Sequence, residues 1–179
     1  MHAFLDRRGT PWTLRPLTDS DLPAWIRLHQ HLVADGRGMI LDLDEIAADV
    51  AEARTRMAAF LDHPEQHHAL VAIGPEGQFG GSCELSRLGR RRIAHVGILA
   101  MGIHPDHQGR GLGRALLEAT LAWGDTHGIR RVELYCRDDN GRAIALYDSL
   151  GFVHEGTRRA FALEPDGSYV DDRIYGRVR

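Results

Sequence analysis

The stretch HPDHQGRGLGRALLEATL, residues 104–121, places three alternating glycines directly before a strongly helical run. Glycine lowers helix stability by about 1 kcal/mol relative to alanine, so glycines at a helix start indicate that the backbone itself is needed there. The first turn of a helix carries N–H groups without intrahelical partners, and its dipole favours negative charge. Glycines let phosphate oxygens approach these groups without meeting a Cβ atom. The stretch therefore predicts an anion site at the start of a helix over residues 112–126.

Two common nucleotide-binding motifs fit this loop poorly. A P-loop requires Lys followed by Ser or Thr after the last glycine, whereas Arg114 and Ala115 stand there. A dinucleotide fingerprint has the order G-x-G-x-x-G in the first turn of a parallel sheet, whereas this loop reads G-x-G-x-G and follows a series of strands. A plain tight turn remains an alternative for the glycines taken alone.

Length and composition narrow the class of protein. A chain of 179 residues that is 43% hydrophobic suits one domain over residues 1–179. A formal net charge of −3 gives no electrostatic case for nucleic-acid binding. Neither a secretory signal nor a run of about 20 apolar residues is present, so we expect a cytoplasmic protein without membrane contact. Cys83 and Cys136 are too few for a disulfide framework, and no spacing indicates a metal site.

Hydrophobic periodicity predicts an α+β domain with the element order β-α-α-β-β-β-α-β-α-β-β. The expected strands span residues 12–17, 68–73, 79–88, 93–103, 132–136, 153–163 and 169–178, the second to fourth forming an antiparallel meander. A capping box of Thr18 and Asp21 precedes a helix over residues 22–33, and one apolar stripe predicts a second helix over residues 46–61. The helix over residues 112–126 has Gly128 as its C-cap, and Asn140 caps a short helix ending at residue 150.

Two motifs stand in order along the chain. The loop QGRGLG, residues 108–113, has the pattern Q/R-x-x-G-x-G/A and follows a strand that ends in Ile-His-Pro-Asp. Downstream, residues 140–152 contain N-x-x-A-x-x-L-Y-x-x-x-G-F in full. Both motifs resemble signatures of the GNAT superfamily, the acyl-CoA-dependent N-acetyltransferases. The opening LRPLTxxD also looks like the family's first strand and helix, so the resemblance covers residues 12–178. The tail GSYVDDRIYGRV looks most like members that acylate amino acids or other small amines.

The resemblance implies a fold and a cosubstrate. The fold is the α+β GNAT fold, a mixed and mostly antiparallel sheet with helices on both faces and a cofactor strand that splays from its neighbour at a bulge. The cosubstrate is acetyl-CoA, with its pyrophosphate on the backbone amides of residues 109–114. Side-chain charge from Arg110 and Arg114 adds to this site, while Asn140 acts as a helix cap, a cofactor contact or both. The implied cofactor-binding residues are Met101, Gly102, Ile103, Gln108, Gly109, Arg110, Gly111, Leu112, Gly113, Arg114, Asn140 and Tyr147.

Acetyl transfer to an amine needs a proton for the departing thiolate, and the resemblance assigns its delivery to Tyr147. The general base stays open, because some family members place a Glu at the position of Gly97. His95 on the same expected strand and Glu84 on the preceding one, acting through a water, are candidates, with a structural or surface role as the alternative for each. An acceptor whose amine has a low pKa needs no base.

These observations predict acetyl transfer from acetyl-CoA to a primary amine of a small molecule such as an amino acid or polyamine. Direct attack in a ternary complex is expected, because neither cysteine lies in a motif for a covalent intermediate. The loop over residues 34–42 and the helices beside it are expected to form a wall for the acceptor. One face of the last strand, carrying Tyr169, Asp171, Arg173 and Tyr175, is also expected to face it; a solvated edge strand is the alternative for that face. A noncatalytic acyl-CoA-binding module and a protein N-terminal acetyltransferase remain alternative functions, and the resemblance allows a homodimer.

Overall fold

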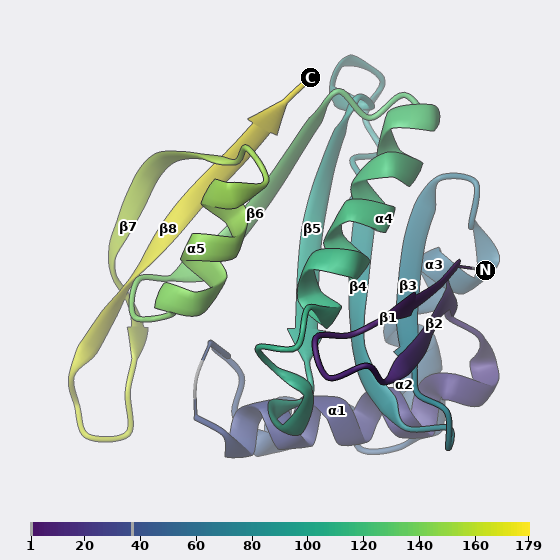
Figure 1. Cartoon of the computed structure of the whole chain (residues 1–179). Helices are drawn as coiled ribbons and strands as arrows, with labels where there is room; N and C mark the ends of the chain where they lie inside the picture. The colour runs from purple at the N-terminus through teal and green to yellow at the C-terminus, as the bar shows by residue number, and fades with distance from the viewer. Residues whose placement is uncertain (1, 37) are drawn as a thin grey trace.

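A mixed sheet forms the centre of the computed structural model, which describes residues 2–36 and 38–179 (Figure 1). Its strand order is β1-β2-β3-β4-β5-β6-β8-β7, and every neighbouring pair except β5 and β6 is antiparallel. The strands are β1 (His2–Leu5), β2 (Pro11–Pro16), β3 (His67–Ile73), β4 (Phe79–Arg87), β5 (Val96–Ile103), β6 (Arg131–Arg137), β7 (Val153–Leu163) and β8 (Tyr169–Val178). The α+β class and the antiparallel meander of β3, β4 and β5 are confirmed.

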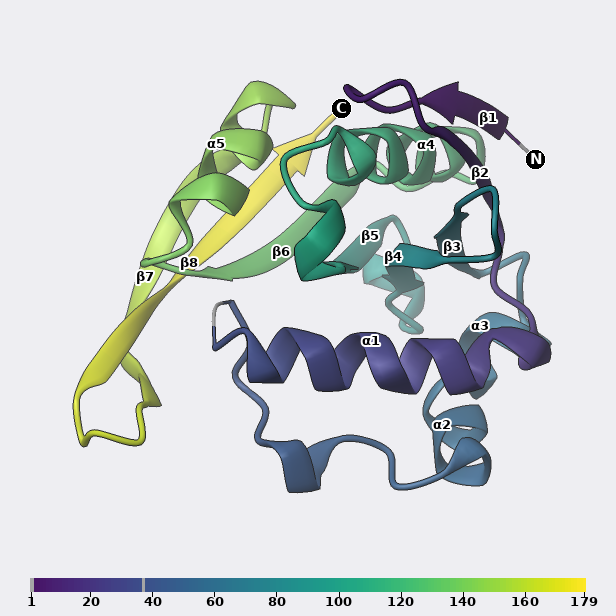
Figure 2. The same cartoon turned by 60° about the horizontal axis from the view of Figure 1, so that its bottom comes forward.

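Helices cover both faces of the sheet, as Figure 2 shows. One face carries α1 (Leu22–Ala34), α2 (Val50–Arg56) and α3 (Ala58–Asp62), and the other carries α4 (Leu112–Thr126) and α5 (Gly141–Ser149). Burial on both faces explains why residues 69–73 of β3 form a continuous apolar run. Within the described residues, no helix is long and apolar enough to cross a membrane.

The parallel strands β5 and β6 separate after a short paired segment. Residues 96–98 pair with residues 131–133, and the two strands then diverge toward the C-terminal end of β5 (Figure 1). The splay expected from the family resemblance is therefore present. The bulge is not, because β4 and β5 keep one register from Gly81 opposite Ile103 to Arg87 opposite Gly97. The opening arises because β6 leaves β5 and stays paired with β8 along its whole length.

Three elements differ from the sequence prediction. The chain begins with a hairpin of β1 and β2, joined by a turn with Gly9 at φ 77°, whereas we predicted a strand only from residue 12. The predicted second helix is two helices that meet at the buried Met57, with Asp49 capping the first through the N–H of Glu52. The strand β5 starts at Val96, after a 3-10 turn over Arg91–Ile93.

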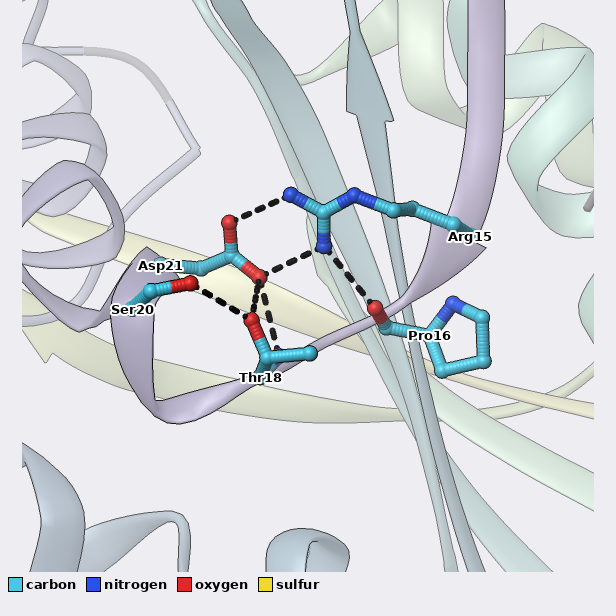
Figure 3. Close-up of polar contacts among 5 residues, drawn as sticks. All are labelled: Arg15, Pro16, Thr18, Ser20 and Asp21. Carbon is cyan, nitrogen blue, oxygen red and sulfur yellow. Dashed lines mark hydrogen bonds and ion pairs between the residues drawn. The ribbon is translucent and has the colours of Figure 1, made fainter.

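A partly buried ion pair fixes the start of α1, and it contains the predicted capping box (Figure 3). The carboxylate of Asp21 accepts hydrogen bonds from the N–H and the hydroxyl of Thr18, both at 2.8 Å. The guanidinium of Arg15, on β2, donates two further bonds of 2.7 Å to the two carboxylate oxygens. Burial opposes ionisation of Asp21, but the bonds from Arg15 and Thr18 outweigh it and hold the pKa of Asp21 below its ordinary value. The pair therefore locks the first helix to the second strand.

We expect Asp21→Asn to lower the free energy of unfolding by about 2 kcal/mol at pH 7, because the half-buried guanidinium of Arg15 loses its charge partner. A carboxyl with a depressed folded-state pKa contributes stability above its unfolded pKa of about 4, and this stability is lost as the pH falls through the lower folded value. The difference in the free energy of unfolding between wild type and variant, measured by urea unfolding, should therefore be constant from pH 7 to 5 and shrink below pH 4. Asp44→Asn, at an exposed carboxylate, is the control and should change stability by less than about 0.5 kcal/mol. A difference that does not depend on pH would contradict this account of the pair.

Candidate functional site

A cavity of about 740 Å³ opens where β5 and β6 separate, and α5 and the glycine loop form much of its wall. Its volume is in the range of pockets that hold small organic ligands. The cavity is lined by ten of the twelve predicted cofactor residues: Met101, Gly102, Ile103, Gln108, Gly109, Gly111, Gly113, Arg114, Asn140 and Tyr147. The structure thus brings together residues from the end of one strand, the following loop and a helix beyond it.

The glycine loop presents a row of backbone donors. Within the described chain, none of the six N–H groups of residues 109–114 donates a hydrogen bond, and the first helical bond runs from the N–H of Ala115 to the carbonyl of Gly111. Gly109 at φ 71° and Gly111 at φ 102° hold left-handed conformations that turn the chain into α4. Unpaired N–H groups at a helix start suit an oxyanion, so the loop can bind phosphate.

The backbone of β5 has a free edge along the cavity. Bonds from the N–H of His104 to the carbonyl of Gly80 and from the N–H of Leu88 to the carbonyl of Val96 fix which residues of β5 point toward β4. By alternation, residues 97, 99, 101 and 103 point their N–H and C=O groups toward β6. Because β6 pairs only as far as Ile98, the polar backbone groups of Met101 and the N–H of Ile103 have no strand partner. They can pair with an amide-bearing chain lying in the opening.

Side chains tie the loop to the neighbouring strand and helix. The amide of Gln108 donates to the carbonyl of Ile103 at 3.1 Å and accepts from Arg142 at 2.6 Å. Arg114 donates to the hydroxyl of Ser149 at 2.5 Å and pairs with Glu118 at 3.2 Å. The loop is therefore held in place before any ligand arrives.

Two predicted cofactor residues turn their side chains away from the cavity. Leu112 is fully buried in the core beneath α4. The guanidinium of Arg110 lies 2.6 Å from the carboxylate of Asp6 and donates to the hydroxyl of Thr10 at 2.8 Å. The prediction that Arg110 adds side-chain charge to the phosphate site is therefore corrected, because Asp6 neutralises that charge.

Tyr147 enters the cavity wall from α5 and is buried. Its ring packs against Phe152 and Tyr175, with ring centroids 5.9 and 6.0 Å away, while no hydrogen bond to another described residue holds its hydroxyl. Burial raises the pKa of Tyr147, so the phenol keeps its proton near neutral pH and can donate it.

The last strand is placed differently from both sequence expectations. Tyr175 is buried here and cannot face an acceptor, and β8 lies between β6 and β7 rather than at an edge. The expectation that Tyr175 faces the acceptor and the alternative of an edge strand are therefore both wrong.

Asn140 caps α5, as predicted. Its side-chain oxygen accepts a hydrogen bond of 3.2 Å from the N–H of Ala143. The same residue lines the cavity, and its amide lies close to Gly38, where an added Cβ would stand 2.6 Å from the side-chain nitrogen. The cap is therefore an observed role, while contact with a cofactor stays a prediction.

The two candidate bases are placed very differently. His95 is exposed in the turn before β5, at the end of that strand remote from the glycine loop, and does not line the cavity. This placement is against a catalytic role for His95. Gly97 is buried, and a Cβ there would lie 2.7 Å from the side chain of Leu85, so the chain has no room for a carboxylate at this position.

Glu84 is half-buried on β4, on the face that α1 covers. It stands opposite the exposed Ala100 of β5, and the indole N–H of Trp25 donates to its carboxylate at 3.4 Å. Burial raises the pKa of Glu84 to about 7, against the opposing effect of hydrogen bonds from Ser82 and Trp25. The carboxyl is not part of the cavity wall, so it can reach a group in the cavity only through a bridging molecule.

Sequence reasoning missed several residues of the cavity wall. Arg7 and Arg142 line the cavity and were not predicted. Leu32, Gly38 and Met39 line it as well. Gly38 and Met39 belong to the loop over residues 34–42 that we expected beside the acceptor; Arg37 in that loop lies outside the described residues. The carbonyl of Met39 accepts a bond of 3.3 Å from Arg137, a buried side chain that also pairs with Asp139 at 2.7 Å. No local pattern signals a contact between residues so distant in the chain.

The family model described as "Acetyltransferase (GNAT) family" matches residues 25–152. The chain belongs to this family. A GNAT acetyltransferase from Streptococcus pneumoniae has a similar structure, with a TM-score of 0.86 at 25% identity, over 94% of this chain and 99% of that one. The glycine loop and α5 described above both lie within the matched residues.

Curated relatives share part of their length with this GNAT chain. A mycothiol acetyltransferase from Salinispora arenicola (strain CNS-205) is 37% identical over 147 residues, which are 78% of this chain and 43% of that protein. The N-alpha-acetyltransferase RimI from Mycobacterium tuberculosis (strain ATCC 25618 / H37Rv) is 38% identical over 101 residues, which are 56% of this chain and 61% of that protein. The chain therefore spans about half the length of these relatives.

Acetyl-CoA is bound in solved structures of two similar acetyltransferases. The residues of this chain fit that molecule. The unpaired N–H groups of residues 109–114 suit its diphosphate, and the free edge of β5 suits the amide-bearing pantetheine arm. The cavity contains both features in one continuous space.

Proposed function

We propose that this GNAT chain is an N-acetyltransferase that moves the acetyl group of acetyl-CoA to a primary amine of a small molecule, such as an amino acid or a polyamine. Attack is direct, in a ternary complex of protein, cosubstrate and amine. One observation carries the proposal: a single cavity contains the free N–H groups of the glycine loop, the free edge of β5 and the side chain of Tyr147.

Backbone groups do most of the binding in this proposal. Residues 109–114 bind the diphosphate, and the polar backbone groups of Met101 and Ile103 pair with the pantetheine arm. Acetyl-CoA supplies the reactive thioester. An N–H group of β5 in this segment stabilises the negative charge that develops on the carbonyl oxygen, a role that fixed donors in a partly dry cavity perform well.

Tyr147 supplies the proton that the departing sulfur needs. Its hydroxyl is free of other described partners, and its burial keeps the phenol protonated near neutral pH. A noncatalytic acyl-CoA-binding module has no use for such a donor at the cavity wall, so the placement of Tyr147 supports an enzyme.

The amine approaches from the side of α1. There Glu84, with a pKa of about 7, can accept a proton from an ammonium group through a bridging water. The hydrogen bond from Arg137 to the carbonyl of Met39 holds Met39 at the cavity wall. A fixed wall of this kind favours a compact acceptor over an extended peptide, although one relative is named as an N-alpha-acetyltransferase.

We expect Tyr147→Phe to lower kcat by about 100-fold or more while leaving the Kd for coenzyme A within about twofold, because the change removes only the hydroxyl. Amino acids, polyamines, aminoglycosides and short peptides should each be tested as the acceptor, with thiol release and product mass as the measurements. An increase of one acetyl group on a small amine supports the proposal. Acetylation of peptide N-termini alone would instead identify a protein acetyltransferase. A variant with wild-type kcat would remove Tyr147 from the mechanism.

Glu84→Gln tests the base. A base must be deprotonated to act, so kcat of the wild type should rise as the pH increases through about 7, the pKa of Glu84. In the variant this rise should disappear and kcat at pH 8 should fall about tenfold or more, leaving only the titration of the acceptor amine. His95→Gln is the control and should retain the wild-type profile, because His95 lies outside the cavity. A rise near pH 7 that persists in Glu84→Gln would contradict the assignment.

A further inference from the structure

The turn of the N-terminal hairpin is docked on the glycine loop. Figure 1 shows the turn between β1 and β2 beside the start of α4. The carboxylate of Asp6 is fully buried and accepts bonds from the indole of Trp12 at 3.0 Å and from the N–H groups of Arg8 at 2.8 Å and Thr10 at 3.0 Å. Its ion pair with Arg110, at 2.6 Å, connects this turn to the loop. These contacts fix the position of the hairpin relative to the loop.

Arg7 follows Asp6 in this turn and reaches the cavity. Its N–H donates to the carbonyl of Arg110 at 2.9 Å, so its backbone is joined directly to the loop. Its Cγ lies 4.0 Å from the position that a Cβ on Gly111 would take, and the residue is part of the cavity wall. The side chain therefore passes over a glycine of the loop whose unpaired N–H groups form the predicted phosphate site.

The lack of a side-chain partner distinguishes Arg7 from the other arginines of the cavity wall. Arg114 is paired with Glu118, and Arg142 donates to the amide of Gln108. The guanidinium of Arg7 is exposed and has no hydrogen bond or ion pair with any described residue. An unpaired guanidinium beside unpaired backbone donors suits a phosphate group, which it can bind through two parallel hydrogen bonds.

We propose that Arg7 binds a phosphate group of coenzyme A, and that Asp6 and Arg110 position the hairpin for this contact. The hairpin precedes the residues that the family model matches, 25–152, so it adds a phosphate contact from outside that region. Arg7 is thus a binding residue, and Asp6 and Arg110 are positioning residues. Affinity for the cosubstrate depends in part on a segment far from the glycine loop in sequence.

Calorimetric titration with coenzyme A tests this proposal without any need for turnover, so it stays informative if the acceptor assignment fails. We expect Arg7→Ala to raise the Kd about tenfold, the loss typical of one charge-assisted hydrogen bond. Arg8→Ala is the matched control, because Arg8 is an exposed arginine in the same turn that does not line the cavity. Its Kd should change less than twofold. Asp6→Asn should weaken binding in the same direction as Arg7→Ala, because the turn is released.

Truncated ligands locate the contact. Pantetheine, which has no phosphate, should bind wild type and Arg7→Ala equally. With dephospho-CoA, an undiminished effect of Arg7→Ala assigns the contact to the diphosphate, and a lost effect assigns it to the 3′-phosphate; both results support phosphate recognition. An unchanged Kd for coenzyme A in Arg7→Ala, an equal loss in Arg8→Ala, or an equal loss with pantetheine would overturn the proposal.

Discussion

The departure of β6 from β5 after Ile98 is the constraint on which the site depends. Backbone N–H and C=O groups that are buried without a partner cost about 1–3 kcal/mol each, so a folded sheet rarely leaves a strand edge open near its centre. Here the opening is maintained by the elements around it. The pairing of β6 with β8 holds one side, and α5 packs over β8 through the contact of Tyr147 with Tyr175, so that it forms a wall of the opening. The polar edge that results is a binding surface made of backbone alone.

Glycines place this edge against the rest of the protein. A Cβ at Gly102 would lie 2.5 Å from the side chain of Leu32, so α1 can approach β5 only because this residue has no side chain. Gly111 has a different function, because its left-handed conformation allows α4 to begin with its first N–H groups free. Glycine therefore serves two purposes here. At Gly102 its missing side chain lets α1 pack against β5, and at Gly111 its left-handed backbone leaves the N–H groups after β5 unpaired.

The sequence pattern predicted the parts of this site that depend on interactions between residues close together in the chain. The helix after the glycine loop, the cap at Asn140 and the box at Thr18 each follow from residues a few positions apart, and each is present. Long-range packing determined the parts that were missed. Arg110 fits a phosphate site by its position in the loop, but Asp6, more than a hundred residues earlier, accepts its charge. The turn residues DRRGT, which separate HAFL from the alternating run PWTLRP, were the available signal for the first hairpin, and hence for Arg7.

The candidate bases show the same limit. His95 and Glu84 were equivalent in the sequence, since both were expected on strands next to the opening. A 3-10 turn shortens β5 and leaves His95 in solvent, whereas Glu84 remains in the register of β4 and beneath Trp25. Where a strand begins is decided by its neighbours in the sheet, and that information is absent from the strand's own residues.

Amide hydrogen exchange, followed residue by residue with and without coenzyme A, tests the central claim most directly. If the open edge of β5 and the start of α4 bind the cosubstrate, coenzyme A should slow exchange at Met101, Ile103 and residues 109–114. Pantetheine should slow exchange at Met101 and Ile103 only. Protection by coenzyme A that appears elsewhere and leaves these amides unchanged would contradict the account.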